Sequence, residues 1–208
     1  MTSINCNFLG LNAIKLAGKK KKFGRKHGGI AVFVHESITK GVSKIPTKGS
    51  DLIILKLDRM FFNLMEDTYL FFAYCSPANS SYTQRTDNDP FSEIEENISN
   101  LGTNAQILLL GDLNARTGET LDYIPNEDNS DLLLPDSYNT DIVATYPRGN
   151  RDPVKNQYGG SLTSLCKSVP PRIYNGRKLC DTVGNFTCHK WNGQSAVDYC
   201  LASPGTNI

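Results

Sequence analysis

The chain has 208 residues, a formal net charge of +1, and contents of 39% hydrophobic, 21% charged and 9% aromatic residues. This length suits a single domain over residues 1–208, and the composition excludes a collagen-like, coiled-coil or wholly disordered protein. No apolar run approaches the roughly 20 residues that a membrane-spanning helix needs, so we expect no membrane partner.

Residues 1–18 lack the pattern of a secretory signal, which favours an intracellular protein. The six cysteines form no C-x-x-C pair, which favours reduced thiols in or near the core over a zinc site or disulfides.

Charge is unevenly distributed along the chain. Residues 1–48 contain ten Lys or Arg and one acidic residue, whereas the rest of the chain contains twelve basic and twenty acidic residues. The basic segment 15–27 includes six candidate nucleic-acid contacts, which are Lys19, Lys20, Lys21, Lys22, Arg25 and Lys26. Such a cluster contacts phosphates or acts as a nuclear import signal, and a solvated loop without a partner is the alternative. Residues 117–147 contain seven acidic residues and no basic one, which predicts an acidic loop insertion.

The first part of the chain is predicted to be rich in strands. Apolar or alternating runs bounded by turn-forming residues predict strands over residues 30–34, 51–57, 68–75 and 106–110. A helix is expected before the last of these strands. Asp89 suits its N-cap, Pro90 its first position and Gly102 its end.

The second part is expected to add one helix and three short strands. Leu162, Leu165 and Cys166 share one face of a helix predicted over residues 159–169. The strands are expected over residues 172–174, 185–188 and 195–202. Because the strand over 106–110 is apolar without alternation, we expect it to be buried on both faces, as in layered α/β packing.

The candidate functional residues stand at or near the ends of predicted strands. Asp112 and Asn114 follow the strand over 106–110, and functional groups of α/β sheets gather at such strand ends. A carboxylate there can accept a proton from water or hold a metal, whereas a turn former or helix cap is the alternative. Tyr74 ends another strand and is a further candidate. The alternative is a core or rim aromatic without a functional role. Asp198 interrupts an apolar strand, where a half-buried carboxylate needs a partner such as a structural Arg or a catalytic His.

Four segments resemble one known family in their residues, order and spacing: GRKHGGIAVFVHESI (24–38), LFFAYCSP (70–77), ILLLGDLNARTG (107–118) and GNFTCHKWNGQSAVDYCLAS (184–203). They are similar to the endonuclease/exonuclease/phosphatase superfamily, specifically to the apurinic endonuclease-like domain of LINE-type, non-LTR retrotransposons. The resemblance covers nearly the whole chain. Inositol-phosphate phosphatases and sphingomyelinases share the Asp-x-Asn element, but the GGIAVFV and NGR segments favour the retrotransposon branch.

The resemblance implies an α/β fold that forms a four-layer sandwich of two mixed β-sheets flanked by helices. It also implies Mg²⁺-dependent hydrolysis of DNA phosphodiesters, a reverse transcriptase domain as a partner in the full-length element, and a nuclear location. Asp112 would activate water, Asn114 would bind the phosphate and hold Asp112, and Tyr74 would stabilise the phosphorus. Asp198 would orient a histidine, and Thr187 is a further phosphate-binding candidate.

This sequence departs from the family pattern in two places. The metal-binding glutamate should precede segment 24–38, yet residues 1–35 contain no Asp or Glu, and no Ser-Asp-His follows Asp198. We therefore expect a fold that is incomplete at both termini and lacks the main Mg²⁺ ligand, with Asp112 and Asn114 as candidate secondary ligands. The endonuclease is expected to be inactive or crippled. A non-catalytic nucleic-acid-binding remnant or a truncated gene product is the alternative.

Overall fold

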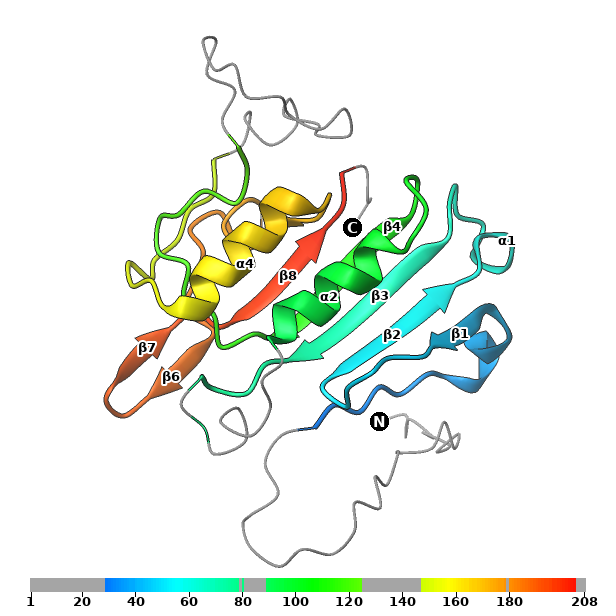
Figure 1. Ribbon diagram of the computed structural model, residues 1–208, viewed down its shortest axis with the longest axis horizontal. Helices are drawn as coiled ribbons and strands as arrows, with labels where there is room; N and C mark the ends of the chain where they lie inside the picture. The colour runs from blue at the N-terminus through cyan, green and yellow to red at the C-terminus, as the bar shows by residue number, and fades with distance from the viewer. Residues whose placement is uncertain (1–28, 79, 81–88, 125–146, 179, 205–208) are drawn as a thin grey trace, which may run out of the picture.

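The computed structural model describes residues 29–78, 80, 89–124, 147–178 and 180–204. These residues form a mixed α/β structure with one large mixed sheet, one small sheet and helices (Figure 1). The large sheet has the strand order β1-β2-β3-β4-β8-β5. Its strands are β1 (Val42–Ile45), β2 (Leu52–Leu57), β3 (Thr68–Tyr74), β4 (Gln106–Asp112), β5 (Arg172–Ile173) and β8 (Asp198–Ala202). β3 and β4 are parallel, and the other neighbouring pairs are antiparallel.

Two helices, α2 (Pro90–Ser99) and α4 (Gln157–Ser168), lie over one face of the large sheet (Figure 1). The Asp89 carboxylate accepts a hydrogen bond from the first turn of α2, and Asn156 caps α4 in the same way. Such caps satisfy backbone N–H groups that have no partner within the helix. Two shorter elements, η1 (Glu36–Gly41) and α1 (Arg59–Phe62), complete the helical part.

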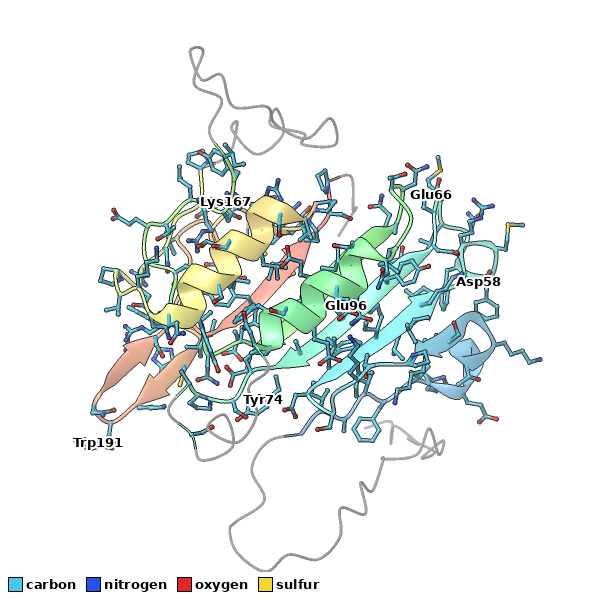
Figure 2. All side chains as sticks on the ribbon, in the orientation of Figure 1. Asp58, Glu66, Tyr74, Glu96, Lys167 and Trp191 are labelled. Carbon is cyan, nitrogen blue, oxygen red and sulfur yellow. The ribbon has the colours of Figure 1, made fainter. Side chains whose placement is uncertain are left out.

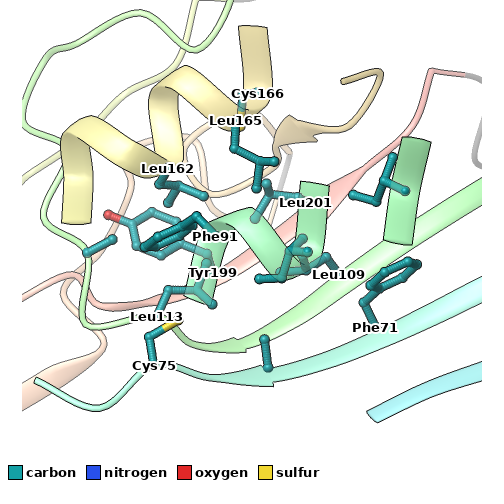
Figure 3. Close-up of a cluster of buried hydrophobic side chains, with 14 of the residues drawn as sticks. Phe71, Cys75, Phe91, Leu109, Leu113, Leu162, Leu165, Cys166, Tyr199 and Leu201 are labelled. Atoms are coloured by element: carbon teal, nitrogen blue, oxygen red, sulfur yellow. The ribbon is translucent and has the colours of Figure 1, made fainter. Parts of the chain in front are cut away.

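The core lies between the two helices and the sheet face that they cover (Figure 3). Ile54, Phe71, Leu109, Leu201 and Ile173 lie side by side on five neighbouring strands, and each is at most 1% exposed. The helices add Phe91, Ile94 and Ile98 from α2, and Tyr158, Leu162 and Leu165 from α4. Burial of each large apolar side chain contributes about 1.5–3 kcal/mol, so this layer is the main source of stability.

The opposite face of the large sheet is also apolar, and four neighbouring side chains on it are only half-buried. Ile53, Phe72, Leu110 and Cys200 are register neighbours across β2, β3, β4 and β8, and all four keep intermediate exposure. We call these four residues the open apolar row. α2 and α4 lie on the other side of the sheet and do not cover it (Figure 1).

A small hairpin of β6 (Cys188–Lys190) and β7 (Gly193–Ser195) extends beyond one end of the large sheet (Figure 1). Trp191 lies in its turn and is 98% exposed. In the described part of the chain, the helices are too short or too polar to span a membrane.

Most predicted elements are present with similar bounds. The strands predicted over 51–57, 68–75 and 106–110 correspond to β2, β3 and β4, and the two predicted helices to α2 and α4. The five cysteines of the described residues are free thiols; Cys75 and Cys166 lie in the core, whereas Cys180 is exposed.

Two strand predictions are wrong, and one strand was missed. Residues 30–34 form no strand despite their alternating exposure, because no described strand pairs with them. Residues 185–187 precede the hairpin, whose first strand begins only at Cys188. The strand predicted over 195–202 is divided, because the chain passes from the hairpin into the large sheet between Ser195 and Asp198. β1 was not predicted, because it is a short edge strand in which only the two end residues are even partly buried.

Candidate active site

Three of the predicted site residues lie in one row across adjacent strands. Tyr74 of β3 is the register partner of Asp112 of β4, and Asp112 is the register partner of Asp198 of β8. Register partners project to the same face of a sheet. Tyr199, the neighbour of Asp198, is buried in the helix-covered core, so the row faces the other side. Figure 2 shows Tyr74 at the end of β3 nearest the hairpin.

Asn114 is fixed directly after this row. Its backbone N–H donates to Oδ1 of Asp112 (3.0 Å), and its Nδ2 donates to the carbonyl oxygen of Cys75 (2.8 Å). Its φ of 46° lies in the left-handed region, which Asn adopts more readily than most residues. An amide nitrogen carries two hydrogens, so one remains to donate to a phosphate oxygen.

Gly111 allows β3 and β4 to approach closely just before Asp112. A Cβ at this position would collide with the carbonyl oxygen of Ala73 on the neighbouring strand. Beyond this point, the backbone N–H of Cys75 donates to the carbonyl oxygen of Asp112 (2.8 Å). The chain segments that leave β3 and β4 are therefore tied together at the site.

Thr187 is joined to the row through Asp198. Its Oγ1 accepts hydrogen bonds from the backbone N–H groups of Val197 and Asp198, both at 3.0 Å. Its own N–H donates to the carbonyl oxygen of Ser195 (3.0 Å). Since the lone pairs of Oγ1 accept from the backbone, the hydroxyl hydrogen remains for a ligand oxygen. The predicted phosphate-binding residue thus lies beside a predicted catalytic residue.

Asp112 has a perturbed pKa. Burial raises the pKa of its carboxyl above the ordinary value, and the negative charge of Asp198 raises it further. The backbone N–H of Asn114 and the charge of Lys190 act in the opposite direction without cancelling the rise. Among the described residues, no group donates a hydrogen bond to the Asp198 carboxylate, and neither aspartate has an ion-pair partner. Two adjacent carboxylates without an ion-pair partner favour the binding of a cation.

The donor set of the row fits a magnesium ion that is shared with a phosphate. Over the described ranges, no three His, Cys, Asp or Glu side chains gather where they could hold a metal. Mg²⁺, however, keeps several waters and binds proteins through one or two carboxylates together with substrate phosphates. Asp112 and Asp198 supply two such carboxylates from register-paired positions, and Asn114 is joined to Asp112 through its backbone N–H.

Four residues around the row were not predicted from the sequence. Asn175 donates to the carbonyl oxygen of Asp198 (3.2 Å) and accepts from the N–H of Cys200 (2.9 Å), so it pairs with β8. The other three are Asp152, Asn156 and Lys190. The N-cap pattern before the predicted second helix could have identified Asn156, and the NGR segment could have drawn attention to Asn175. No local sequence signal marks Asp152 or Lys190.

The predicted basic contacts lie outside the described residues; they are Lys19, Lys20, Lys21, Lys22, Arg25 and Lys26. Of the acidic segment 117–147, the structure describes residues 117–124 and 147. The two ends of this segment are held together by Arg148. Its guanidinium donates to Oγ1 of Thr117 (2.9 Å) and to the carbonyl oxygens of Gly118 (3.2 Å) and Thr120 (3.4 Å).

A scan against protein-family models found no family that matches this chain, and a search of curated proteins found no match either. The function is therefore inferred from the residues of the site and their geometry.

Proposed function

We propose that this chain is a phosphodiester-hydrolysing domain of the LINE-type retrotransposon endonuclease family, with DNA as its substrate and the nucleus as its location. The observation that carries the proposal is the row of Tyr74, Asp112 and Asp198, with Asn114 and Thr187 hydrogen-bonded to its members. These are the five residues to which the family resemblance gives a role. They come from three distant segments of the chain, and their convergence supports a common pocket for a phosphate. A reverse transcriptase domain is the partner expected in a full-length element.

Each residue of the site has a role in attack on a phosphodiester. The Asp112 carboxylate accepts a proton from the attacking water as a general base. Asn114, Thr187 and Tyr74 donate hydrogen bonds to the phosphate oxygens on which negative charge develops. Asp112 and Asp198 would hold Mg²⁺, which would supply positive charge to the phosphate.

We propose a slow turnover for this site. Among the described residues, no glutamate or histidine hydrogen-bonds to Asp112, Asn114 or Asp198. The family resemblance calls for one residue of each type. Loss of one acid–base group typically costs about 10²–10⁴-fold in rate, so slow nicking is the expected behaviour.

The finer architecture is part of the same proposal. The open apolar row of Ile53, Phe72, Leu110 and Cys200 is half-buried on the face opposite the helices. Its burial under a second β-sheet would gain about 25 cal/mol for each Å² of apolar surface removed from water. We infer that a second sheet packs on this face, which would give the four-layer sandwich.

Nicking of supercoiled plasmid tests the proposal. The chain with Mg²⁺ is expected to convert supercoiled plasmid slowly to the relaxed form, and EDTA or Asp112→Ala is expected to stop the reaction. Glu96→Ala is the matched control, because this carboxylate is exposed and lies on the helix-covered side. Equal nicking by the wild type and Asp112→Ala, or no nicking by the wild type at any Mg²⁺ concentration, contradicts the proposal.

Nucleic-acid binding without cleavage is a second candidate function, which the hairpin favours. Trp191 is almost fully exposed in its turn, next to Lys190, and Figure 2 shows it beyond the end of the sheet on which Tyr74 lies. An exposed aromatic ring beside a basic residue suits stacking on bases combined with phosphate contact.

Tryptophan fluorescence distinguishes this second function. Trp191 is the only tryptophan of the chain, so quenching by a short DNA oligonucleotide reports on the hairpin directly. We expect quenching and an affinity that falls steeply with salt, because each neutralised phosphate releases counterions. Quenching without Mg²⁺-dependent nicking supports binding alone. Absence of quenching at low salt excludes the hairpin as a binding surface.

A further inference from the structure

Asp152 is a fully buried carboxylate that accepts one hydrogen bond within its own loop, from the backbone N–H of Val154 (3.1 Å), and three from the two segments that carry the site. Arg116 donates to it twice, from Nε to Oδ2 (2.8 Å) and from one terminal nitrogen to Oδ1 (2.6 Å). The backbone N–H of Ala196 donates to Oδ2 (3.0 Å). Arg116 lies two residues after Asn114, and Ala196 lies two residues before Asp198. Asp152 therefore joins the loop after β4 to the segment that enters β8.

Asn156 holds the same loop at a second point. Its Nδ2 donates to the carbonyl oxygen of Asn114 (2.9 Å), and its Oδ1 accepts from the backbone N–H of Arg116 (2.9 Å). Its own backbone N–H donates to the carbonyl oxygen of Arg116 (2.9 Å). The same Oδ1 accepts from Gly159 (2.7 Å), so the residue that caps α4 also fixes the loop. A Cβ at Gly159 would collide with the Arg116 carbonyl oxygen, so the helix start and the loop are in direct contact.

We propose that Asp152 and Asn156 are positioning residues, which hold Asn114 and Asp198 in the geometry that receives a phosphate. A non-glycine residue in the left-handed region persists only where its surroundings over-determine it. Asn114 meets this condition, because Asn156 binds its carbonyl, Asp112 binds its N–H and Cys75 binds its side chain. The catalytic consequence rests on the proposed function, whereas the positioning itself does not.

The structure contains a second buried aspartate–arginine pair that serves as a comparison. Asp122 accepts two hydrogen bonds of 2.6 Å from Arg177 and one of 2.9 Å from the backbone N–H of Ile173. Its chemistry matches that of Asp152 and Arg116. Its partners, however, lie on and after β5, and none belongs to the loop that carries Asn114. A purely structural role for Asp152 would make the two aspartates equivalent.

Three substitutions separate positioning from general stability. Asn156→Asp keeps the side-chain oxygen that accepts from the backbone N–H groups of Gly159 and Arg116, and Asp caps helices about as well as Asn. It removes the side-chain N–H that donates to the Asn114 carbonyl oxygen. Asp152→Asn removes the charge that holds Arg116 while the side chain keeps its shape. Asp122→Asn makes the same change in the comparison pair and serves as the matched control.

The experiment compares amide NMR spectra and plasmid nicking for the full chain and these variants. We expect the Asn114 backbone and side-chain amides and the Asp198 amide to shift in Asn156→Asp and Asp152→Asn, and to keep wild-type positions in Asp122→Asn. We also expect kcat for nicking to fall about 100-fold in the two positioning variants, because a small misplacement of reacting groups has effects of this size. KM is expected to stay near the wild-type value, since ground-state binding is retained.

Several results overturn the inference. It fails if the Asn114 and Asp198 signals stay unchanged in the positioning variants, if Asp122→Asn shifts them equally, or if they shift while kcat is unchanged. If Asp152→Asn does not fold, Asn156→Asp carries the test alone. If the wild type does not nick DNA, the proposed function fails, and the spectra alone decide whether the two residues position Asn114 and Asp198.

Discussion

Asp112 and Asp198 are register partners on β4 and β8, so two carboxylates project from adjacent antiparallel strands to the same face of the sheet. Neither has an ion-pair partner among the described residues. By contrast, Asp122 and Asp152 are each bound by two guanidinium hydrogen bonds from an arginine. The pKa of Asp112 is raised above its ordinary value, whereas the pKa values of Asp122 and Asp152 are lowered, and this difference in sign is measurable.

The first prediction concerns the electrostatic coupling of the two carboxylates. In Asp198→Asn, the pKa of Asp112 should fall toward its ordinary value, because one of the charges that raise it is removed. Burial continues to raise it, so the return is incomplete. A pH titration of the Asp112 carboxyl carbon by NMR measures the change, with Glu96→Gln as a control that should leave the titration unaltered. An unchanged Asp112 titration in Asp198→Asn would show that the two groups do not interact.

The second prediction concerns the pH dependence of stability. Folding raises the pKa of Asp112, so the folded state holds this proton more tightly than the unfolded state does. The free energy of unfolding therefore falls as pH rises from the pKa of the unfolded chain, about 3.9, through the higher pKa of the folded protein. Relative to the wild type, Asp112→Asn should therefore gain stability between pH 3 and pH 7. Thermal unfolding at the two pH values measures this difference.

Asp122→Asn should show the opposite dependence in the same measurement. Burial alone would raise the pKa of Asp122, but the hydrogen bonds and charge of Arg177 hold it below its ordinary value. The stabilising contribution of ionised Asp122 is present at pH values above its pKa in the unfolded chain. It is lost as pH falls toward its lower pKa in the folded protein. Asp122→Asn should therefore lose stability relative to the wild type between pH 3 and pH 7. The same sign for both variants would refute this assignment of environments.

The third prediction concerns the Asp122–Arg177 pair itself. Arg177→Ala leaves Asp122, which is 1% exposed, without its counter-charge and should lower the free energy of unfolding by about 3–5 kcal/mol. Lys48→Ala removes an exposed ion pair with Glu96 and should cost at most about 1 kcal/mol. Urea unfolding of both variants gives the comparison. Equal small losses would mean that water or another cation replaces Arg177.

Local sequence patterns were sufficient for the elements whose signals lie within a few residues. Asp89 and Pro90 mark the start of α2, and the apolar run before Asp112 marks β4, because a cap or a buried strand is encoded where it forms. The pattern over residues 30–34 failed, since an apolar run forms a strand only if another strand pairs with it. Such pairing depends on parts of the chain that are distant in sequence.

The candidate site was predictable in its residues but not in its construction. Asp112 and Asn114 stand at a visible strand end, whereas the alignment of Tyr74 and Asp198 with Asp112 depends on the register of three strands. Asp152 could not be identified, because a single aspartate in a loop gives no local sign that it will bind Arg116 and Ala196.

The most direct test of the phosphodiester site is to locate a bound DNA phosphate. A short duplex with Ca²⁺, which replaces Mg²⁺ and slows hydrolysis, would be titrated into isotope-labelled chain while the amide signals are recorded by NMR. The predicted result is saturable shifts at Asp112, Asn114, Thr187 and Asp198, which disappear in Asn114→Ala. Saturable binding whose shifts leave these four residues unchanged would contradict the account.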